Sequence, residues 1–128
     1  MTFDLQMLVW SAALAIVQML IAVVGAQSQV GLPALAGNRE ELPTITGWAG
    51  RARRAFYNMV ENLLLFAIVV IVAHLAGRTD STTALGAALF FWARLAFALI
   101  YLVGVPWLRT AAWAVSFAGI MLILSRLF

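Results

Sequence analysis

Residues 50–66, GRARRAFYNMVENLLLF, carry three arginines, two asparagines and a glutamate into one of the most apolar runs of the chain. The run continues to Ala76, so the segment is long enough for a helix that crosses a bilayer, which takes about 20 residues. On a helix with about 100° per residue, four of the polar side chains fall within a sector about 80° wide. These four are Arg51, Arg54, Asn58 and Glu61. The stretch therefore predicts a transmembrane helix with one polar face.

The composition of the whole chain is that of a membrane protein. Of its 128 residues, 65% are hydrophobic and 10% are charged, and the mean hydropathy is +1.02. A soluble domain is about half apolar and about a quarter charged. With no cysteine and one histidine, we expect no disulfide, no cysteine nucleophile and no metal site. The basic residues lie at segment ends or within apolar runs, so nucleic acid is not an expected partner.

Four apolar stretches are long enough to span a bilayer, and such continuous stretches can span it only as helices. The first lacks the basic start and the short length of a signal peptide, so we expect it to be retained. In the turn at residues 77–81, Asp80 or Ser81 can cap the third helix. We predict an all-α, left-handed four-helix bundle that forms a single domain over residues 1–128. Its expected helices cover about residues 5–26, 48–76, 82–104 and 106–126.

The arginines predict an orientation in the membrane. Four of them precede or begin the second helix, and Arg109 lies on the same side, whereas Arg78 and Arg126 lie on the other. Because positive charge favours the cytoplasmic side, we expect the first and third connections to be cytoplasmic and both termini to be outside. Trp48 and Trp107 fall at the same expected interface, as an aromatic belt requires.

The third predicted helix also carries polar residues. Arg94 and Tyr101 are seven residues apart and share a face with Phe97. An arginine near the bilayer centre costs at least about 2.5–3.5 kcal/mol, so Arg94 should face a partner or a wet cavity. Glu61 is the only carboxylate within the apolar stretches and is the natural partner. Such a pair, with Asn58, could simply stabilise the packing of the helices. The arginines of the polar faces outnumber this one carboxylate, however, which favours binding of an anionic ligand.

Two motifs carry a family resemblance. Residues 54–61, RAFYNMVE, resemble the R-A-x-x-N-x-x-E signature of the MAPEG family, the membrane-associated proteins in eicosanoid and glutathione metabolism. Residues 93–95, ARL, followed by Tyr101 and then Arg109, are similar to the family's third-helix pattern and the arginine beyond it. The resemblance runs from about Gly37 to the C-terminus.

This resemblance implies a four-helix subunit in a bacterial-type inner membrane that assembles as a homotrimer. Glutathione, as co-substrate, would bind between neighbouring subunits near the cytoplasmic face. Tyr101 would contact the peptide or its sulfur, and Arg109 would activate the thiol. Together with the polar faces, the resemblance predicts which residues bind glutathione. They are Arg51, Arg54, Asn58, Glu61, Arg94 and Thr110.

The chemistry of glutathione agrees with these assignments. Its carboxylates suit Arg51 or Arg54, its ammonium group suits Glu61, and its amides suit Asn58. Its thiol has a pKa of about 8.5, and only the ionised form is the nucleophile. A guanidinium such as that of Arg109 stabilises the thiolate and lowers the pKa of the thiol.

Three replacements depart from the family pattern, because Phe56, Tyr57 and Phe97 stand where many members have polar or basic residues. The sequence therefore disfavours eicosanoid synthesis as the native task. It favours a transferase or peroxidase acting on lipophilic electrophiles or lipid hydroperoxides. A noncatalytic lipid-binding or scaffold protein is the alternative, which the apolar Phe56 and Phe97 support.

A small four-span transporter is a third hypothesis. Such exporters place an essential carboxylate in the first helix. The first predicted helix here has only Gln6, Ser11 and Gln18 as notable polar residues, and Asp4 falls outside it. This composition disfavours transport.

Overall fold

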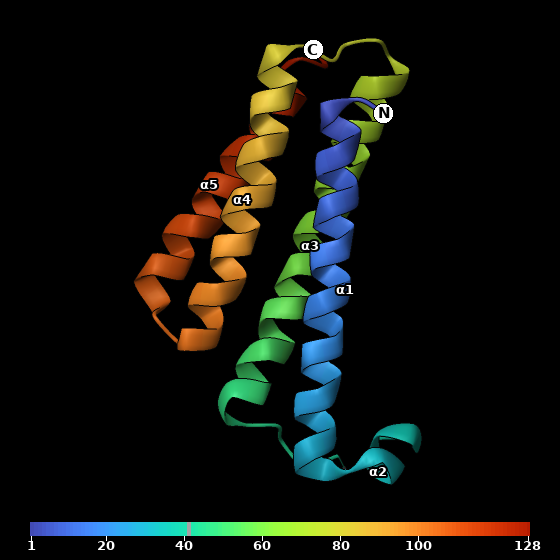
Figure 1. Ribbon diagram of the computed structural model, residues 1–128, viewed down its shortest axis with the longest axis vertical. Coiled ribbons are helices and arrows are strands. Elements are labelled where there is room, and N and C mark those ends of the chain that lie inside the picture. Colours follow the sequence, from blue (N-terminus) through green and yellow to red (C-terminus); the bar gives the residue numbers. More distant parts are fainter. Residues whose placement is uncertain (41) are drawn as a thin grey trace.

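The computed structural model describes residues 1–40 and 42–128, and every regular element in them is a helix (Figure 1). The four long helices are α1 (Phe3–Val30), α3 (Gly47–Leu75), α4 (Ser81–Val103) and α5 (Pro106–Ser125), and α2 (Leu32–Ala36) is short. Each of the four is long and apolar enough to cross a membrane. The predicted all-α fold with four spanning helices is confirmed.

The helices form two packed pairs, α1 with α3 and α4 with α5, and α3 and α4 also pack against each other. The chain alternates in direction, so both termini lie at one end and α2 lies at the other (Figure 1). We refer to these as the terminal end and the α2 end. The α2 end holds the connection from α1 to α3 and the shorter connection from α4 to α5.

The first helix is longer than expected at both ends. It begins at Phe3, with Thr2 as its N-cap, and ends at Gly31, which has a φ of 82°. Asp4 therefore lies in the first turn of α1, where it is 4% exposed, and not outside the helix. Gln29 holds the other end of α1 to the start of α3, because its side chain bonds both the N–H and the carbonyl of Thr46.

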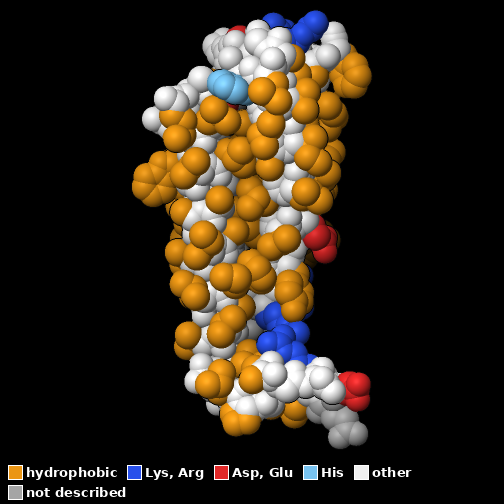
Figure 2. Space-filling view, turned by 90° about the vertical axis from the view of Figure 1, so that its right-hand side faces the viewer, with side chains coloured by type: hydrophobic (Ala, Val, Ile, Leu, Met, Phe, Trp, Pro, Cys, Tyr) orange, Lys and Arg blue, Asp and Glu red, His pale blue; other side chains and the backbone are white. Residues whose placement is uncertain are grey.

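The bundle is apolar both inside and outside. Its core includes the stacked rings of Phe66 and Phe90, whose centroids are 3.9 Å apart, between α3 and α4. Large hydrophobic side chains are exposed on all four long helices. Figure 2 shows hydrophobic side chains over most of one face and basic side chains gathered at its two ends. Such a surface requires contact with lipid.

Two glycines set the spacing of α4 and α5. A Cβ added to Gly86 would lie 2.5 Å from the carbonyl oxygen of Gly119, and one added to Gly119 would lie 2.5 Å from that of Gly86. Small residues at a crossing point let two membrane helices approach closely. This close packing holds the two helices together toward the terminal end, and the short connection at Gly104 and Val105 places the start of α5 beside the end of α4.

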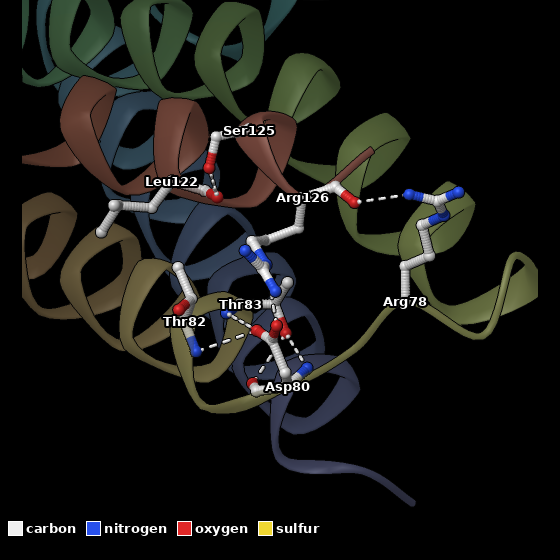
Figure 3. Close-up of polar contacts among 7 residues, drawn as sticks. All are labelled: Arg78, Asp80, Thr82, Thr83, Leu122, Ser125 and Arg126. Atoms are coloured by element: carbon white, nitrogen blue, oxygen red, sulfur yellow. Dashed lines mark hydrogen bonds and ion pairs between the residues drawn. The ribbon is translucent and has the colours of Figure 1, made fainter. Parts of the chain in front are cut away.

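The turn between α3 and α4 is tied to the C-terminus of α5 (Figure 3). Asp80 caps α4, because its Oδ1 accepts from the backbone N–H groups of Thr82 and Thr83 at 2.9 and 3.0 Å. Arg126 Nε donates to Asp80 Oδ2 at 2.8 Å. Arg78 in turn donates to the carbonyl of Arg126. The sequence prediction of a cap at Asp80 or Ser81 is confirmed for Asp80.

Replacing Asp80 with alanine is expected to lower the melting temperature at neutral pH and to have less effect in acid. The backbone N–H of Thr83 and then the Arg126 guanidinium hold the pKa of the Asp80 carboxyl below its ordinary 3.8. Because the pKa is lower in the folded state, the carboxylate stabilises the fold above about pH 4 and loses this effect as the pH falls through the folded pKa.

Thermal unfolding of the wild type and Asp80→Ala at neutral pH and at about pH 3 measures this effect. Arg126→Gln is the matched control, since it removes the ion pair and keeps the cap, and its loss should be smaller. An equal difference between wild type and Asp80→Ala at both pH values would contradict the assignment.

Candidate functional site

A chain of side-chain hydrogen bonds joins α4, α3 and α5. Arg94 Nη2 donates to Asn58 Oδ1 at 2.7 Å, and the same oxygen accepts from Asn62 Nδ2 at 3.2 Å. Asn62 Oδ1 accepts from Trp113 Nε1, also at 3.2 Å. Two donors therefore fix the orientation of the Asn58 amide.

Arg94 is buried, and it pairs with no carboxylate of the described residues. It is 1% exposed, and its guanidinium lies 4.1 Å from the centroid of the Phe97 ring. Its Nε and Nη1 atoms are buried and have no hydrogen-bond partner among the described residues. The sequence predicts Glu61 as the partner of Arg94, and this prediction is wrong. Glu61 is exposed and pairs with no described residue, and Asn58, about 60° away from it around α3, accepts from Arg94 instead.

A pocket of about 260 Å³ opens beside this chain of hydrogen bonds. It lies toward the α2 end, where α4 passes into α5. The described residues that line it include no acidic side chain. They are Asn58 of α3, Phe97 and Tyr101 of α4, and Arg109, Thr110 and Trp113 of α5.

Tyr101 stands between two guanidinium groups. Arg109 lies 4.4 Å from the centroid of the Tyr101 ring, and Arg54 lies 6.0 Å from it. Arg54 Nε also donates to the Tyr101 hydroxyl at 3.3 Å. The phenol oxygen thus accepts from Arg54, and its own proton is available to a ligand in the pocket. Arg109 donates no hydrogen bond to a described residue, so its five N–H groups are also available.

The structure brings some candidate residues together and not others. Asn58, Tyr101, Arg109 and Thr110 share the pocket, and Arg54 contacts it through Tyr101. The hydroxyl of Thr110 already donates to the carbonyl of Pro106, in its own helix. Arg51 and Glu61 do not line the pocket.

Arg51 and Arg94 contact the site only indirectly. Arg51 Nε donates to the carbonyl of Leu102 at the end of α4, at 3.0 Å. This bond suits a cation at a helix C-terminus. Arg94 lies behind Asn58 and Phe97, so it supports the pocket wall without lining the pocket.

Sequence reasoning missed two residues of the site. Trp113 lines the pocket and donates to Asn62, and neither residue is among the predicted site residues. Helical spacing was the available signal, since Trp113 follows Arg109 by four residues and Asn62 follows Asn58 by four. The contact between the two residues joins α3 to α5 and depends on the tertiary packing.

The pocket suits an anion that also carries apolar groups. Arg109 and Arg54 supply positive charge, the Tyr101 hydroxyl supplies a donor, and Phe97 and Trp113 supply apolar walls. A partly dehydrated guanidinium stabilises an anionic nucleophile more strongly than it would in water. This arrangement can therefore hold a thiolate, a carboxylate or a phosphate.

Comparison with known proteins identifies the family. Searches of curated proteins and of solved structures found no match. The model of the MAPEG family matches residues 7–128, which is nearly the whole chain. Both motifs that resemble this family lie within that match, at residues 54–61 and 93–95, as does the pocket. The chain belongs to the MAPEG family.

Proposed function

We propose that the protein is a glutathione-dependent transferase or peroxidase that acts on lipophilic electrophiles or lipid hydroperoxides. The observation that supports this proposal most directly is the Arg109 guanidinium over the Tyr101 ring, in a pocket lined by no described carboxylate. Membership of the MAPEG family supports glutathione as the source of the thiol.

The proposed reaction uses the thiolate of glutathione. The proton of the glutathione thiol passes to water. Arg109 then stabilises the sulfur anion, and the Tyr101 hydroxyl donates a hydrogen bond to the same sulfur. In conjugation, the sulfur attacks an electrophilic carbon, an S–C bond forms, and the leaving group departs with its electron pair. In peroxide reduction, the sulfur attacks the terminal oxygen, the O–O bond breaks, and the alcohol leaves after protonation. A second glutathione then converts the sulfenic acid to the disulfide and releases water.

The remaining residues bind the peptide in this proposal. Arg54 pairs with a glutathione carboxylate and Asn58 bonds an amide. Arg51 and Glu61, which do not line the pocket within one subunit, pair with a carboxylate and the ammonium group where the peptide extends to the neighbouring subunit. Thr110 serves as a second donor near the sulfur if its hydroxyl turns from Pro106. Because Arg94 donates to Asn58 from behind the pocket, we assign it a positioning role.

We further propose that residues 1–128 form a single transmembrane domain and that three copies assemble into a homotrimer. Glu61 supports the assembly, since an exposed carboxylate within an apolar span is unfavourable against lipid and needs a polar neighbour. The family match supports both proposals. The α2 end, which carries the arginine-rich first connection, would face the cytoplasm, with both termini outside.

A noncatalytic lipid-binding protein is the second candidate. The apolar walls that Phe97 and Trp113 give the pocket favour it, because they suit a lipid chain as well as an electrophile. Measurements of glutathione binding and of turnover distinguish the two functions.

The test uses purified protein in nanodiscs. Titration calorimetry should show saturable binding of glutathione. Initial rates with 1-chloro-2,4-dinitrobenzene or cumene hydroperoxide should then exceed the rate without protein. Saturable binding without turnover would support the noncatalytic alternative, and absence of binding would overturn the proposal. Turnover that survives replacement of both Arg109 and Tyr101 would overturn the site assignment.

A further inference from the structure

A second hollow lies at the α2 end, between α1, α2 and α3. It has a volume of about 320 Å³ and is lined mostly by apolar side chains. These include Ala22 and Val23 of α1, Leu32 and Leu35 of α2, and Phe56 of α3. The polar side chains occur together, from Arg39, Arg53 and Tyr57. The apolar part runs along the outer surface of α1, where Val23 is 48% exposed, so a lipid chain can enter from the side.

The groove continues into a basin lined by cations. The basin has a volume of about 420 Å³, shares Arg39, Arg53 and Tyr57 with the groove, and adds Arg54. The described residues that line the two hollows include no acidic side chain. An apolar groove and a cationic basin are therefore joined through the same three residues.

Two of these arginines are held in place through their Nε atoms. Arg39 Nε donates to the carbonyl of Leu35 at 2.6 Å, and Arg53 Nε donates to the Tyr57 hydroxyl at 2.9 Å. The Nη atoms of both arginines donate to no described residue. A guanidinium fixed through Nε presents its terminal N–H groups to the oxygens of a phosphate.

The position of the basin identifies the occupant. It lies where the apolar spans end, and Figure 2 shows basic side chains near the α2 end, at the edge of the apolar surface. This is the depth of lipid head groups, where each nearby cation contributes about 1 kcal/mol to attraction of an anionic lipid. We propose that the groove and basin bind one anionic phospholipid, with an acyl chain in the groove and the phosphate between Arg39 and Arg53. A soluble anion would leave the apolar part of the site empty.

Native mass spectrometry of the detergent-solubilised protein with added phosphatidylglycerol or phosphatidylcholine tests this proposal. Phosphatidylglycerol should bind at least about tenfold more tightly, because it lacks the cationic head group of phosphatidylcholine. Arg39→Gln and Arg53→Gln should each weaken its binding about fivefold, and the double variant about 30-fold. Arg78→Gln, which removes an arginine at the terminal end, is the matched control and should bind as the wild type does.

The alternatives give different results. Equal binding of the two lipids, or wild-type binding by a folded double variant, would overturn the proposal. Displacement of phosphatidylglycerol by inorganic phosphate would show a site for free phosphate, and displacement by glutathione would show a peptide site. Arg53→Lys keeps the charge without the bidentate geometry, so its affinity for phosphatidylglycerol should fall less than that of Arg53→Gln. Circular dichroism checks that each variant is folded. The proposal does not depend on turnover, so it and the proposed enzymatic activity fail separately.

Discussion

Replacing Arg109 with glutamine is expected to lower kcat/KM for glutathione conjugation by about 100-fold at a pH near 6.5. A cation in contact with an anion lowers the pKa of the conjugate acid by about 1–3. Without Arg109, the thiol should titrate near its free value of about 8.5, so little thiolate is present at this pH. The loss should shrink as the pH rises toward about 9, where the thiol ionises unaided.

A pH profile of initial rates with 1-chloro-2,4-dinitrobenzene measures the effect, and the thiolate absorbance of bound glutathione near 240 nm reports ionisation directly. Arg78→Gln is the control for a general loss of positive charge, because Arg78 lies at the terminal end. Tyr101→Phe keeps the ring beneath Arg109 and removes one donor, so its loss should be about tenfold. A pH profile unchanged in Arg109→Gln would show that Arg109 does not act on the thiol.

Replacing Asn58 with leucine is expected to lower the free energy of unfolding by about 3 kcal/mol. The oxygen of Asn58 accepts from both Arg94 and Asn62, and Arg94 has no other hydrogen-bond partner among the described residues. Leucine has a similar volume and accepts no hydrogen bond, so it leaves a buried guanidinium without an acceptor among the described residues. The same change replaces a polar group of the pocket wall with an apolar one, so glutathione affinity should fall as well.

Asn58→Asp is the matched control, since it keeps an oxygen for Arg94 and for Asn62 and should be much less destabilising. Thermal or chemical unfolding in a fixed detergent compares the two variants with the wild type. If leucine and aspartate were equally destabilising, the effect would come from packing and not from the bond to Arg94. Stability unchanged in Asn58→Leu would show that Arg94 finds another acceptor.

Much of the fold follows from local features of the sequence. The long apolar runs predict spanning helices, because a helix satisfies its own backbone hydrogen bonds in hydrocarbon. Gly104, at a φ of 93°, and Pro106 mark the end of α4 and the start of α5 as helix rules require. The family motifs placed Asn58, Tyr101 and Arg109 among the candidates, and the structure brings these three to one pocket.

The contacts between polar side chains of different helices depend on which face each helix turns to its neighbours. A polar face about 80° wide does not reveal which of its edges meets the next helix. The sequence therefore predicts Glu61 as the partner of Arg94, whereas in the structure Asn58 accepts from Arg94. Trp113 and Asn62 meet across α3 and α5, at a separation of 51 residues. The sequence by itself therefore determined the number of spanning helices, the approximate ends of α3, α4 and α5, and the number of cations, since each depends on neighbouring residues. Only the tertiary structure decided the partners of the buried polar groups, because these depend on how each helix is rotated about its own axis.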